Sequence, residues 1–326
     1  MEIVITDHRF AHVDEERRAV EAAGGKLVVG QVTEEDKLTA LCSKADGVLV
    51  VRAPITRRVI DAMTRCRIIV RYGIGIDNVD IPAASARGIM VANVPDYCID
   101  EVSDHALTLL LMLSRQTIAA AALAREKQWS VAKMPSLHRL RGQVCGLFGA
   151  GRIGALLAAK VAPLGMQVIV HDPYLDDERA RQMGIAKVSF DELLSRSDFI
   201  SIHAPLNEKT HHIFGEKAFA KMKSRAYIVN TARGGLIDEA ALISAIDSGI
   251  LAGAGLDVLE SETSVTELRS ALVQHPKIIV TAHTAWVSEE ARATLQARAI
   301  SQALTALAGK EPYGLVNGKD LVRNSR

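Results

Sequence analysis

Cysteine and aromatic residues are scarce in this sequence of 326 residues. Only four cysteines occur, and none stands in the CxxC spacing of a zinc cluster or a redox motif. A disulfide framework is not expected either, because small secreted domains that depend on disulfides carry cysteine at far higher density. We therefore expect free thiols, no metal site and a reducing compartment.

Long apolar runs and charge of a single sign are also lacking. No stretch approaches the roughly 18 consecutive apolar residues of a membrane span, and the first residues form a strand-like pattern without a basic leader. Lys and Arg number 39 against 38 Asp and Glu, a net charge of +1, whereas a nucleic-acid binder usually shows a basic excess. These absences predict a soluble, cytoplasmic protein with a small-molecule partner, no membrane and no nucleic acid.

Aliphatic residues are abundant. Hydrophobic residues make up 48% of the chain and aromatics only 4%, so the cores must consist mainly of Val, Ile, Leu and Ala. That composition is typical of a parallel sheet covered by helices on both faces. At about 150 residues per domain, the length predicts two domains.

Short apolar strands alternate with helical segments along the chain, which predicts an α/β fold of two doubly wound parallel-sheet domains. The first series has strands near residues 2–6, 26–29, 47–51 and 68–70. A long helix over 100–127, with apolar residues at helical spacing, separates it from the second series. The second series has strands near 144–148, 167–171, 199–203, 226–230, 252–258 and 278–281.

A glycine motif stands at the first turn of the second series. Gly149, Gly151 and Gly154 form a GxGxxG between a strand and a helix, with Arg152 and Ile153 inside it. The first glycine permits the tight turn, the second lets the backbone approach a pyrophosphate, and the third lets helix and strand pack closely. The helix N-terminus attracts the phosphate charge. Alone, such a motif also occurs as an ordinary glycine-rich turn.

Asp172 lies at the end of the next strand, about 20 residues further on, as the dinucleotide fingerprint requires. Its carboxylate should accept hydrogen bonds from ribose hydroxyls and repel a 2′-phosphate. The three following residues include no arginine to compensate for that repulsion. The motif therefore predicts NAD rather than NADP as the cofactor.

Three chemically versatile residues follow later strands of the second series. Arg233, Asp257 and His283 each come just after a predicted strand, and Glu262 follows Asp257 by five residues. Ligands bind at the carboxyl ends of strands in open α/β sheets. An arginine, an acid and a histidine at this edge can converge in one site, and they supply what reduction of a 2-keto acid requires.

These motifs together resemble one known family. In order they are Asn93-Val-Pro, the GxGxxG, Asn230-Thr-Ala-Arg-Gly-Gly, Asp257-Val-Leu-Glu-Ser-Glu and His283-Thr-Ala-Trp. They are similar to those of the D-isomer-specific 2-hydroxyacid dehydrogenases, over almost the whole chain. Within the family, residues 71–80 and 172–175 resemble most the C-terminal-binding-protein branch.

The resemblance implies an NAD-dependent oxidoreductase that interconverts a 2-keto acid and a D-2-hydroxy acid, either of the glyoxylate and hydroxypyruvate type or larger. His283 resembles the acid/base that exchanges a proton with the substrate oxygen. Glu262 resembles its carboxylate partner, which orients the ring. Arg233 resembles the clamp whose planar guanidinium grips the substrate carboxylate.

The resemblance also implies residues that contact the cofactor and the substrate. Asp257 resembles the residue that holds the nicotinamide end. The wall of the cofactor groove is implied for Ala204, Pro205, Thr210 and Thr231. Gly73, Ile74 and Gly75 resemble the loop that binds the substrate carboxylate. Arg71 resembles the basic residue beside that loop, and Trp286 resembles the apolar wall for the substrate side chain.

The implied domains are a Rossmann NAD-binding domain over 100–288 and a flavodoxin-like substrate domain, also called the catalytic domain, formed by 1–99 and 289–326. The resemblance further implies a homodimer through the NAD-binding domain. Two residues depart from the family pattern, since Thr263 and Ala282 stand where the family usually has proline.

For several residues a purely structural role stays open. Trp286 also suits plain core packing, and Arg71 also suits an exposed surface. His211 and His212 should not face one way, because neighbours in sequence usually point apart, so they are interpreted as solvated loop residues. His105, in the long helix, is interpreted as a surface or interface histidine.

Two other functions remain possible at this point. One is an NAD(H)-sensing scaffold with little turnover, like the corepressors of the same branch. The other is a phosphite-type dehydrogenase; a formate-type enzyme is disfavoured because that group lacks the acid partner that Glu262 provides. The absence of an added regulatory domain disfavours a phosphoglycerate-type enzyme.

Overall fold

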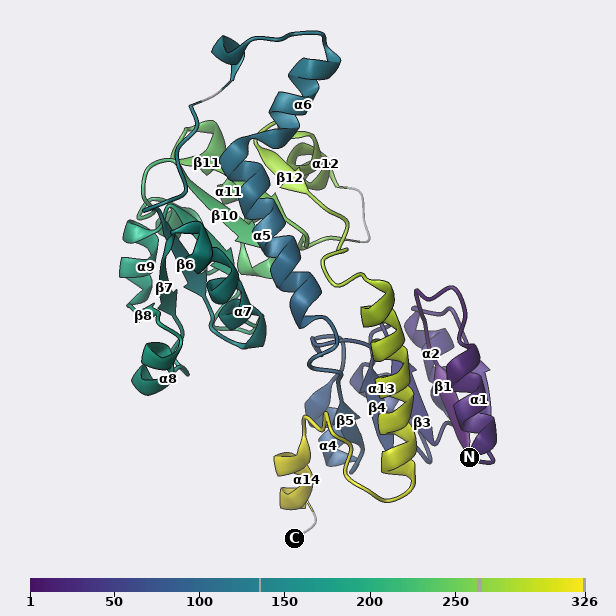
Figure 1. The fold of residues 1–326 in the computed structure, drawn as a ribbon. Helices are drawn as coiled ribbons and strands as arrows, with labels where there is room; N and C mark the ends of the chain where they lie inside the picture. The colour runs from purple at the N-terminus through teal and green to yellow at the C-terminus, as the bar shows by residue number, and fades with distance from the viewer. Residues whose placement is uncertain (135, 263–265, 325–326) are drawn as a thin grey trace. The chain divides into compact units, whose positions relative to one another are not determined.

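The computed structural model describes residues 1–134, 136–262 and 266–324. The chain divides into two compact units. The first unit comprises Met1–Tyr97 and Ser288–Arg326, and the second comprises Cys98–Val287. Each unit has its own sheet (Figure 1).

The first unit is built on a five-stranded parallel sheet of order β2-β1-β3-β4-β5. This is the flavodoxin-like order, and it confirms the predicted fold class for this unit. The strands are β1 (Glu2–Ile5), β2 (Lys26–Val29), β3 (Gly47–Val50), β4 (Ile68–Arg71) and β5 (Met90–Ala92). The helices are α1 (Asp14–Ala22), α2 (Glu35–Cys42), α3 (Arg57–Ala62), α4 (Ile81–Ala86), α13 (Glu289–Leu307) and α14 (Gly318–Asn324).

The helix α13, at which the chain returns from the second unit, completes the first unit. The helix α13 begins at a side-chain cap, where the Ala291 amide donates to Ser288 Oγ at 2.8 Å, and it packs against α1, β3 and β4. A buried carboxylate joins three elements at this contact. Glu16 of α1 accepts hydrogen bonds from the Tyr72 hydroxyl, just after β4, and from the Gln296 amide of α13, each at 3.0 Å. Burial and the neighbouring carboxylate raise the pKa of Tyr72 well above its usual value.

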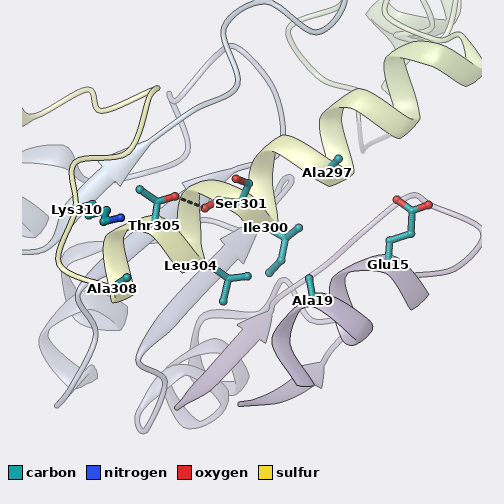
Figure 2. A pocket seen from close by; sticks show the side chains of 9 residues that line it. All are labelled: Glu15, Ala19, Ala297, Ile300, Ser301, Leu304, Thr305, Ala308 and Lys310. Atoms are coloured by element: carbon teal, nitrogen blue, oxygen red, sulfur yellow. Dashed lines mark hydrogen bonds between the residues drawn. The ribbon is translucent and has the colours of Figure 1, made fainter. Parts of the chain in front are cut away.

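A pocket of about 550 Å³ opens between α1 and α13 (Figure 2). Its lining is largely aliphatic, including Ile300 and Leu304, with Glu15 and Lys310 as its charged residues. None of the site residues predicted from the sequence lines it.

The second unit is built on a seven-stranded parallel sheet of order β12-β11-β10-β9-β6-β7-β8. It is the Rossmann order with one strand added at an edge, again as predicted. The strands are β6 (Val144–Phe148), β7 (Gln167–His171), β8 (Ala186–Lys187), β9 (Phe199–Ile202), β10 (Ala226–Asn230), β11 (Leu251–Leu256) and β12 (Ile278–Val280). The α-helices are α5 (Ile99–Arg115), α6 (Thr117–Arg125), α7 (Arg152–Val161), α8 (Asp177–Gln182), α9 (Phe190–Arg196), α10 (Glu216–Phe219), α11 (Glu239–Asp247) and α12 (Glu267–Gln274). Short 3-10 turns are η1 (Val131–Lys133), η2 (Ala162–Leu164) and η3 (Gly234–Leu236).

The chain order reverses between β6 and β9. Strands β7 and β8 extend the sheet on one side of β6, whereas β9 to β12 extend it on the other. Loops that leave two adjacent strands in opposite directions leave a crevice at the carboxyl edge, and nucleotides bind there in open α/β sheets. The sheet therefore places a ligand crevice beside the glycine motif that follows β6.

The predicted single helix over 100–127 is wrong. Gln116 adopts a left-handed conformation with φ of 50° and separates α5 from α6. The two helices are bent by 59°, and together they reach the length and composition of a membrane span, whereas no single helix among the described residues does. The apolar face of α5, including Leu109, Leu110 and Leu113, is buried in the core of the second unit.

Candidate functional site

The glycine motif packs the first turn of the second unit against the neighbouring strand. Gly149 has φ of 99°, and a side chain on it would meet the carbonyl of His203, after β9, at 2.9 Å. A Cβ on Gly154 would collide with the Gly149 carbonyl oxygen. Both positions thus require glycine, as the sequence motif predicts.

The middle glycine has the opposite surroundings. Apart from its two chain neighbours, no described residue lies within 4 Å of where a Cβ on Gly151 would be, and this residue is the N-cap of α7. Arg152, in the first turn of α7, is exposed, and Ile153 is half-buried. An open space against the N-terminus of a helix fits the pyrophosphate of a dinucleotide, because the helix amides point into it and the helix dipole favours negative charge.

Asp172 directly follows β7, and backbone amides hold its carboxylate. The Ala150 amide donates to one oxygen at 2.9 Å and the Tyr174 amide donates to the other at 2.8 Å. A carboxylate can accept about four hydrogen bonds, so these two contacts fix the group and leave acceptor capacity for the hydroxyls of a ribose.

The segment after β9 forms a tight turn that carries Ala204, Pro205 and Thr210. The Thr210 hydroxyl donates to the Pro205 carbonyl and accepts from the Asn207 amide, each at 2.8 Å. At the start of this segment, burial lowers the pKa of His203 to about 4, so its ring is neutral near pH 7.

Thr231 lies just after β10, at the same edge of the sheet, and is buried. Its hydroxyl has no hydrogen-bond partner among the described residues. A buried hydroxyl at a strand end is a natural contact for a polar ligand atom, because such groups are normally paired. The geometry around the loops after β6, β7, β9 and β10 therefore fits a bound dinucleotide.

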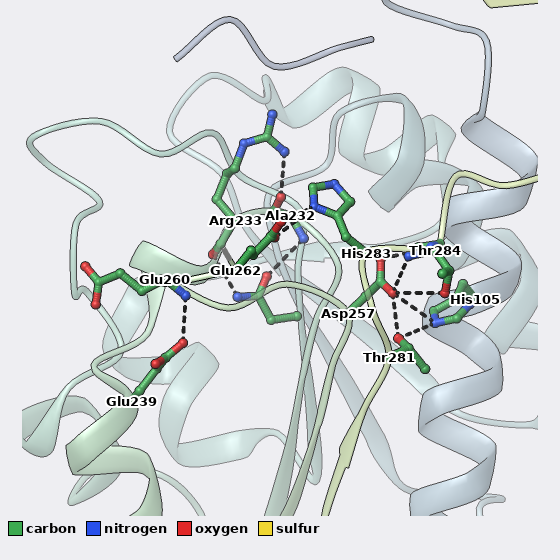
Figure 3. A network of polar contacts seen from close by, with 12 residues as sticks. His105, Ala232, Arg233, Glu239, Asp257, Glu260, Glu262, Thr281, His283 and Thr284 are labelled. Atoms are coloured by element: carbon green, nitrogen blue, oxygen red, sulfur yellow. Dashed lines mark hydrogen bonds and ion pairs between the residues drawn. The ribbon is translucent and has the colours of Figure 1, made fainter. Parts of the chain in front are cut away.

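His283 follows β12 and contacts a carboxylate. Its Nδ1 lies 2.8 Å and 2.9 Å from the two carboxylate oxygens of Glu262, and both side chains are about three-quarters buried, with 26% and 24% exposed (Figure 3). This contact occupies one ring nitrogen and fixes the ring plane. Nε2 lies on the other side of the ring, where it can exchange a proton with a substrate.

The His283 backbone adopts an unusual conformation. Its φ is 55°, in the left-handed region that non-glycine residues seldom occupy. Its amide donates to the Asp257 carbonyl at 2.8 Å. Left-handed residues of this kind persist where the surrounding structure fixes them, and they concentrate at functional sites.

Asp257, after β11, fixes this loop with its side chain. Its carboxylate is 1% exposed, and it accepts the Thr284 and Ala285 amides at 2.9 Å each and the Thr281 hydroxyl at 2.5 Å (Figure 3). The contacts made by this side chain therefore set the path of the chain on both sides of His283.

His105 of α5 belongs to the same network. Its Nε2 lies 2.9 Å from Thr281 Oγ1 and 3.6 Å from Asp257 Oδ1. The His105 side chain is 23% exposed and faces the loop before His283, so it is not a plain surface residue. No local pattern indicates the contact with Thr281, since the two residues are 176 positions apart. The interpretation of His105 as an interface histidine stays a prediction.

Arg233 caps the start of η3, and its loop packs against the loop that carries Glu262. The Asn230 side chain closes the turn by donating to the Arg233 carbonyl at 2.8 Å. A Cβ on Gly234 would collide with the backbone of Leu259 and Glu260. The glycine after Arg233 thus permits two loops from adjacent strands to touch. Figure 3 draws Arg233, whose guanidinium donates to the Ala232 carbonyl, together with the contact of Glu262 and His283.

The remaining predicted residues are divided between the units. Arg71 ends β4 in the first unit, and its guanidinium lies against the α-carbon of Gly73, which has φ of 136°. Asn93 supports the same loop, because its side-chain amide donates to the Ile74 carbonyl at 2.6 Å. Trp286 belongs to the second unit and is half-buried.

Gly75 follows in the same loop. The departure at Thr263 lies outside the described residues, whereas Ala282 is exposed beside His283.

The expectation that the side chains of His211 and His212 point apart is wrong, whereas the expectation that both are solvated loop residues is confirmed, since they are 52% and 36% exposed. Their rings stack with centroids 3.9 Å apart, and both face the carboxylate of Glu260. The cause is the backbone of His212, whose φ of 49° turns its side chain to the same side as that of its neighbour.

The family model that matches this chain covers residues of the second unit only. Residues 107–285, more than half of the sequence, match the family model of the NAD binding domain of D-isomer specific 2-hydroxyacid dehydrogenases. This match confirms the family resemblance and NAD as the cofactor of the second unit. The branch within the family stays a prediction.

Two related proteins illustrate the range of the similarity. The D-3-phosphoglycerate dehydrogenase of Mycobacterium tuberculosis (strain ATCC 25618 / H37Rv) is 40% identical over 301 residues, covering 91% of this chain and 56% of that protein. The glyoxylate reductase of Korarchaeum cryptofilum is 32% identical over 295 residues, covering 90% of this chain and 86% of that protein. The chain thus spans about half the length of the phosphoglycerate dehydrogenases that it matches.

Solved structures show the same fold. A glyoxylate reductase from Paecilomyes thermophila has a TM-score of 0.88 and 29% identity, with 98% of each chain covered. A D-2-hydroxyisocaproate dehydrogenase has a TM-score of 0.83 and 27% identity, with 98% of this chain and 100% of that chain covered.

Replacing Asp257 with alanine should destabilise the second unit and loosen the His283 loop. The Thr284 and Ala285 amides would lose their acceptor, and each buried donor left unpaired costs about 1–3 kcal/mol. We expect the free energy of unfolding in urea to fall by at least about 2 kcal/mol. Hydrogen exchange of residues 281–285 should also become faster.

The matched control is Asp177→Ala, which removes a carboxylate of the same unit that is 83% exposed. Surface changes of this kind usually stay within about 0.5 kcal/mol. Equal effects of the two substitutions would contradict the role of Asp257 in holding the loop.

Proposed function

The chain belongs to the D-isomer specific 2-hydroxyacid dehydrogenase family, and we propose that it reduces a 2-keto acid to a D-2-hydroxy acid with NADH. The observation that carries this proposal is the contact of His283 Nδ1 with Glu262 at 2.8 Å, at the carboxyl edge of a Rossmann sheet. A ring fixed through one nitrogen and directed by a carboxylate is the arrangement of a general acid/base.

NADH, when bound, supplies the hydride that reaches the keto carbon. The protonated His283 ring donates the Nε2 proton to the keto oxygen as that oxygen gains charge. Glu262 stabilises the imidazolium before the transfer and keeps the ring in position. In the oxidation direction the neutral ring accepts the hydroxyl proton.

Arg233 supports the other half of the proposed chemistry. A guanidinium can bind a carboxylate with two parallel hydrogen bonds, which fixes the substrate in register as well as attracting it. Its loop packs against the backbone at Leu259 and Glu260, two residues before Glu262. This proximity supports a single site in which Arg233 orients a 2-keto acid toward His283.

In the first unit, we assign the backbone at Gly73, Ile74 and Gly75 to the substrate carboxylate and Arg71 to its surroundings. The position of Arg71 against Gly73 supports this assignment, because it places positive charge beside the backbone loop. Trp286 would provide the apolar wall for the substrate side chain.

As substrate we favour a small 2-keto acid of the glyoxylate and hydroxypyruvate type. This choice is supported by similarity to a glyoxylate reductase over most of the length of both proteins. The higher identity to phosphoglycerate dehydrogenases makes 3-phosphoglycerate the competing substrate to measure. We also place the protein in the cytoplasm, which its four free cysteines support.

We further propose a homodimer formed by the segment 117–134 of the second unit. The helix α6 has no buried residue, and the segment exposes Ile118 by 50% and Trp129 and Val131 by 89% each. Apolar side chains gathered on one exposed segment mark interaction surfaces.

The double substitution Trp129→Asp with Val131→Asp should shift the mass in sedimentation velocity from dimer toward monomer. Tyr174→Asp, at an aromatic residue 93% exposed elsewhere in the unit, should leave the dimer intact. A wild-type monomer at micromolar concentration would contradict the proposal.

Turnover should require His283. Glyoxylate, hydroxypyruvate, pyruvate and larger 2-keto acids should oxidise NADH, and His283→Ala should lower kcat by about 10²–10⁴-fold, the usual contribution of a general acid. The Kd of NADH should change little, because the ring acts on the substrate oxygen.

The matched control is His138→Ala, an exposed histidine of the same unit. If the wild type binds NADH but reduces none of these acids, and oxidises neither 3-phosphoglycerate nor phosphite with NAD, the result would contradict the proposed activity and support an NAD(H)-sensing scaffold. Near-normal turnover in His283→Ala would remove His283 from the mechanism.

Asp172 should decide the preference between NADH and NADPH. Asp172→Asn keeps an oxygen for one backbone amide but removes the charge that repels a 2′-phosphate. We expect the ratio of kcat/KM for NADH over NADPH to fall at least about tenfold, since an unfavourable charge contact of about 1.4 kcal/mol is relieved. Asp177→Asn, at an exposed acid of α8, serves as the control. An unchanged ratio in Asp172→Asn would count against the ribose contact.

A further inference from the structure

An exposed cluster of His211, His212 and Glu260 lies on the second unit, apart from the contacts that hold His283. The ligand-capable atoms of the three side chains all lie within 4.8 Å of one another. His211 Nε2 lies 3.3 Å from Glu260 Oε1, and His212 Nε2 lies 3.1 Å from each carboxylate oxygen. Three potential donor atoms thus converge on one point accessible from solvent.

The backbone holds this arrangement in place. His212 occupies the left-handed region, with φ of 49°, and its amide donates to the Gly235 carbonyl at 2.8 Å. The His211 amide donates to the Asn207 carbonyl at 2.9 Å. The two rings are stacked within 25° of parallel, and both Nε2 atoms lie against the Glu260 carboxylate.

Glu260 is held from behind. Its backbone amide donates to the carboxylate of Glu239, the first residue of α11, at 2.7 Å. This buried acid fixes the chain at Glu260 without occupying the Glu260 side chain. The carboxylate therefore faces the two histidines from a fixed backbone.

The distances match those of a metal site. Zinc binds imidazole nitrogen and carboxylate oxygen at about 2.0–2.2 Å, so ligand atoms around a tetrahedral ion lie ~3.3 Å apart. The nitrogen-to-oxygen separations of 3.1 and 3.3 Å agree with this value. An ion bound by both imidazoles requires the stacked rings to turn, because each Nε2 lone pair lies in the plane of its own ring and the planes are only 25° apart. Three protein ligands would leave the fourth position for water.

We propose that His211, His212 and Glu260 form a binding site for a divalent transition-metal ion, of which Zn²⁺ is the representative. Imidazole ligands select such ions over Mg²⁺ and Ca²⁺, which prefer six or more oxygen ligands. The proposal does not depend on the oxidoreductase activity, because it concerns only the binding of the ion.

Binding would join two loops of the proposed active site. His211 and His212 end the turn that carries Ala204, Pro205 and Thr210, and Glu260 precedes Glu262 by two residues. A bound ion would therefore cross-link the proposed cofactor-groove wall to the loop that holds His283, and it would stabilise both by mass action.

The cysteines are poor competitors for the ion. Metal binds thiolate, and burial raises the pKa of Cys42, Cys66 and Cys145 to about 12 each. Among the described residues of this unit, imidazoles also contact carboxylates at His275 with Asp247, at His105 with Asp257 and at the pair of His283 and Glu262, which belongs to the adjoining loop. The experiment must therefore separate that pair from the cluster.

The test is calorimetric titration of the full chain with ZnCl₂ after removal of metal by a chelator. We expect one ion per chain, with Kd increased at least about tenfold by His211→Ala, His212→Asn or Glu260→Gln. Asparagine is chosen at 212 because it tolerates the left-handed backbone.

His138→Ala should leave Kd unchanged, and MgCl₂ and CaCl₂ should give no binding. Absence of saturable Zn²⁺ binding, equal binding in all variants, or loss of binding only in His283→Ala would overturn the proposal.

A second measurement uses the unmodified protein, so that it does not depend on the folding of a variant. Diethyl pyrocarbonate modifies accessible histidine nitrogens, and mass spectrometry locates the modified residues. Zn²⁺ should protect His211 and His212 several-fold and leave His138 equally reactive. Equal modification of His211 and His212 with and without Zn²⁺ would overturn the site.

Discussion

The Asp257 carboxylate is the interaction on which the candidate site depends. It holds the amides of Thr284 and Ala285, and its own carbonyl accepts the amide of His283, whose backbone is left-handed. These contacts direct the His283 ring toward Glu262. Without them the loop after β12 would have no reason to retain a conformation that costs about 1–3 kcal/mol.

Close backbone contacts bring the other loops to the same edge of the sheet. Glycine at 149 and 154 permits the first turn to pack against β9 and α7, and glycine at 234 permits the Arg233 loop to pack against residues 259–260. Parallel strands end at one edge, so residues far apart in sequence can meet there. The proposed site therefore depends on glycines, because these residues allow its loops to pack closely against one another.

The sequence predicts well those features that local pattern determines. The two sheets, the close packing of Gly149 and Gly154 and the place of Asp172 directly after β7 follow from periodicity and from spacing within one βα unit, and the fold class and the family are confirmed. The cofactor contacts of these residues stay predictions. The errors arise where one backbone angle or a distant contact decides. Left-handed residues at 116 and 212 break a predicted helix and turn two neighbouring histidines to the same side. The contact of His105 with Thr281 cannot be predicted from a local pattern, because the two residues are 176 positions apart in the sequence. The strand β5 is not among the strands predicted from the sequence, because its three residues are too few to show an alternating pattern.

The central claim is that this chain transfers hydride from NADH to a 2-keto acid to give the D-hydroxy acid. The most direct measurement uses NADH deuterated at the transferable C4 position, with hydroxypyruvate as the acceptor, followed by analysis of the product on a chiral column and by mass spectrometry. The account predicts D-glycerate with deuterium at C2. Formation of L-glycerate, or of glycerate without the label at C2, would contradict it.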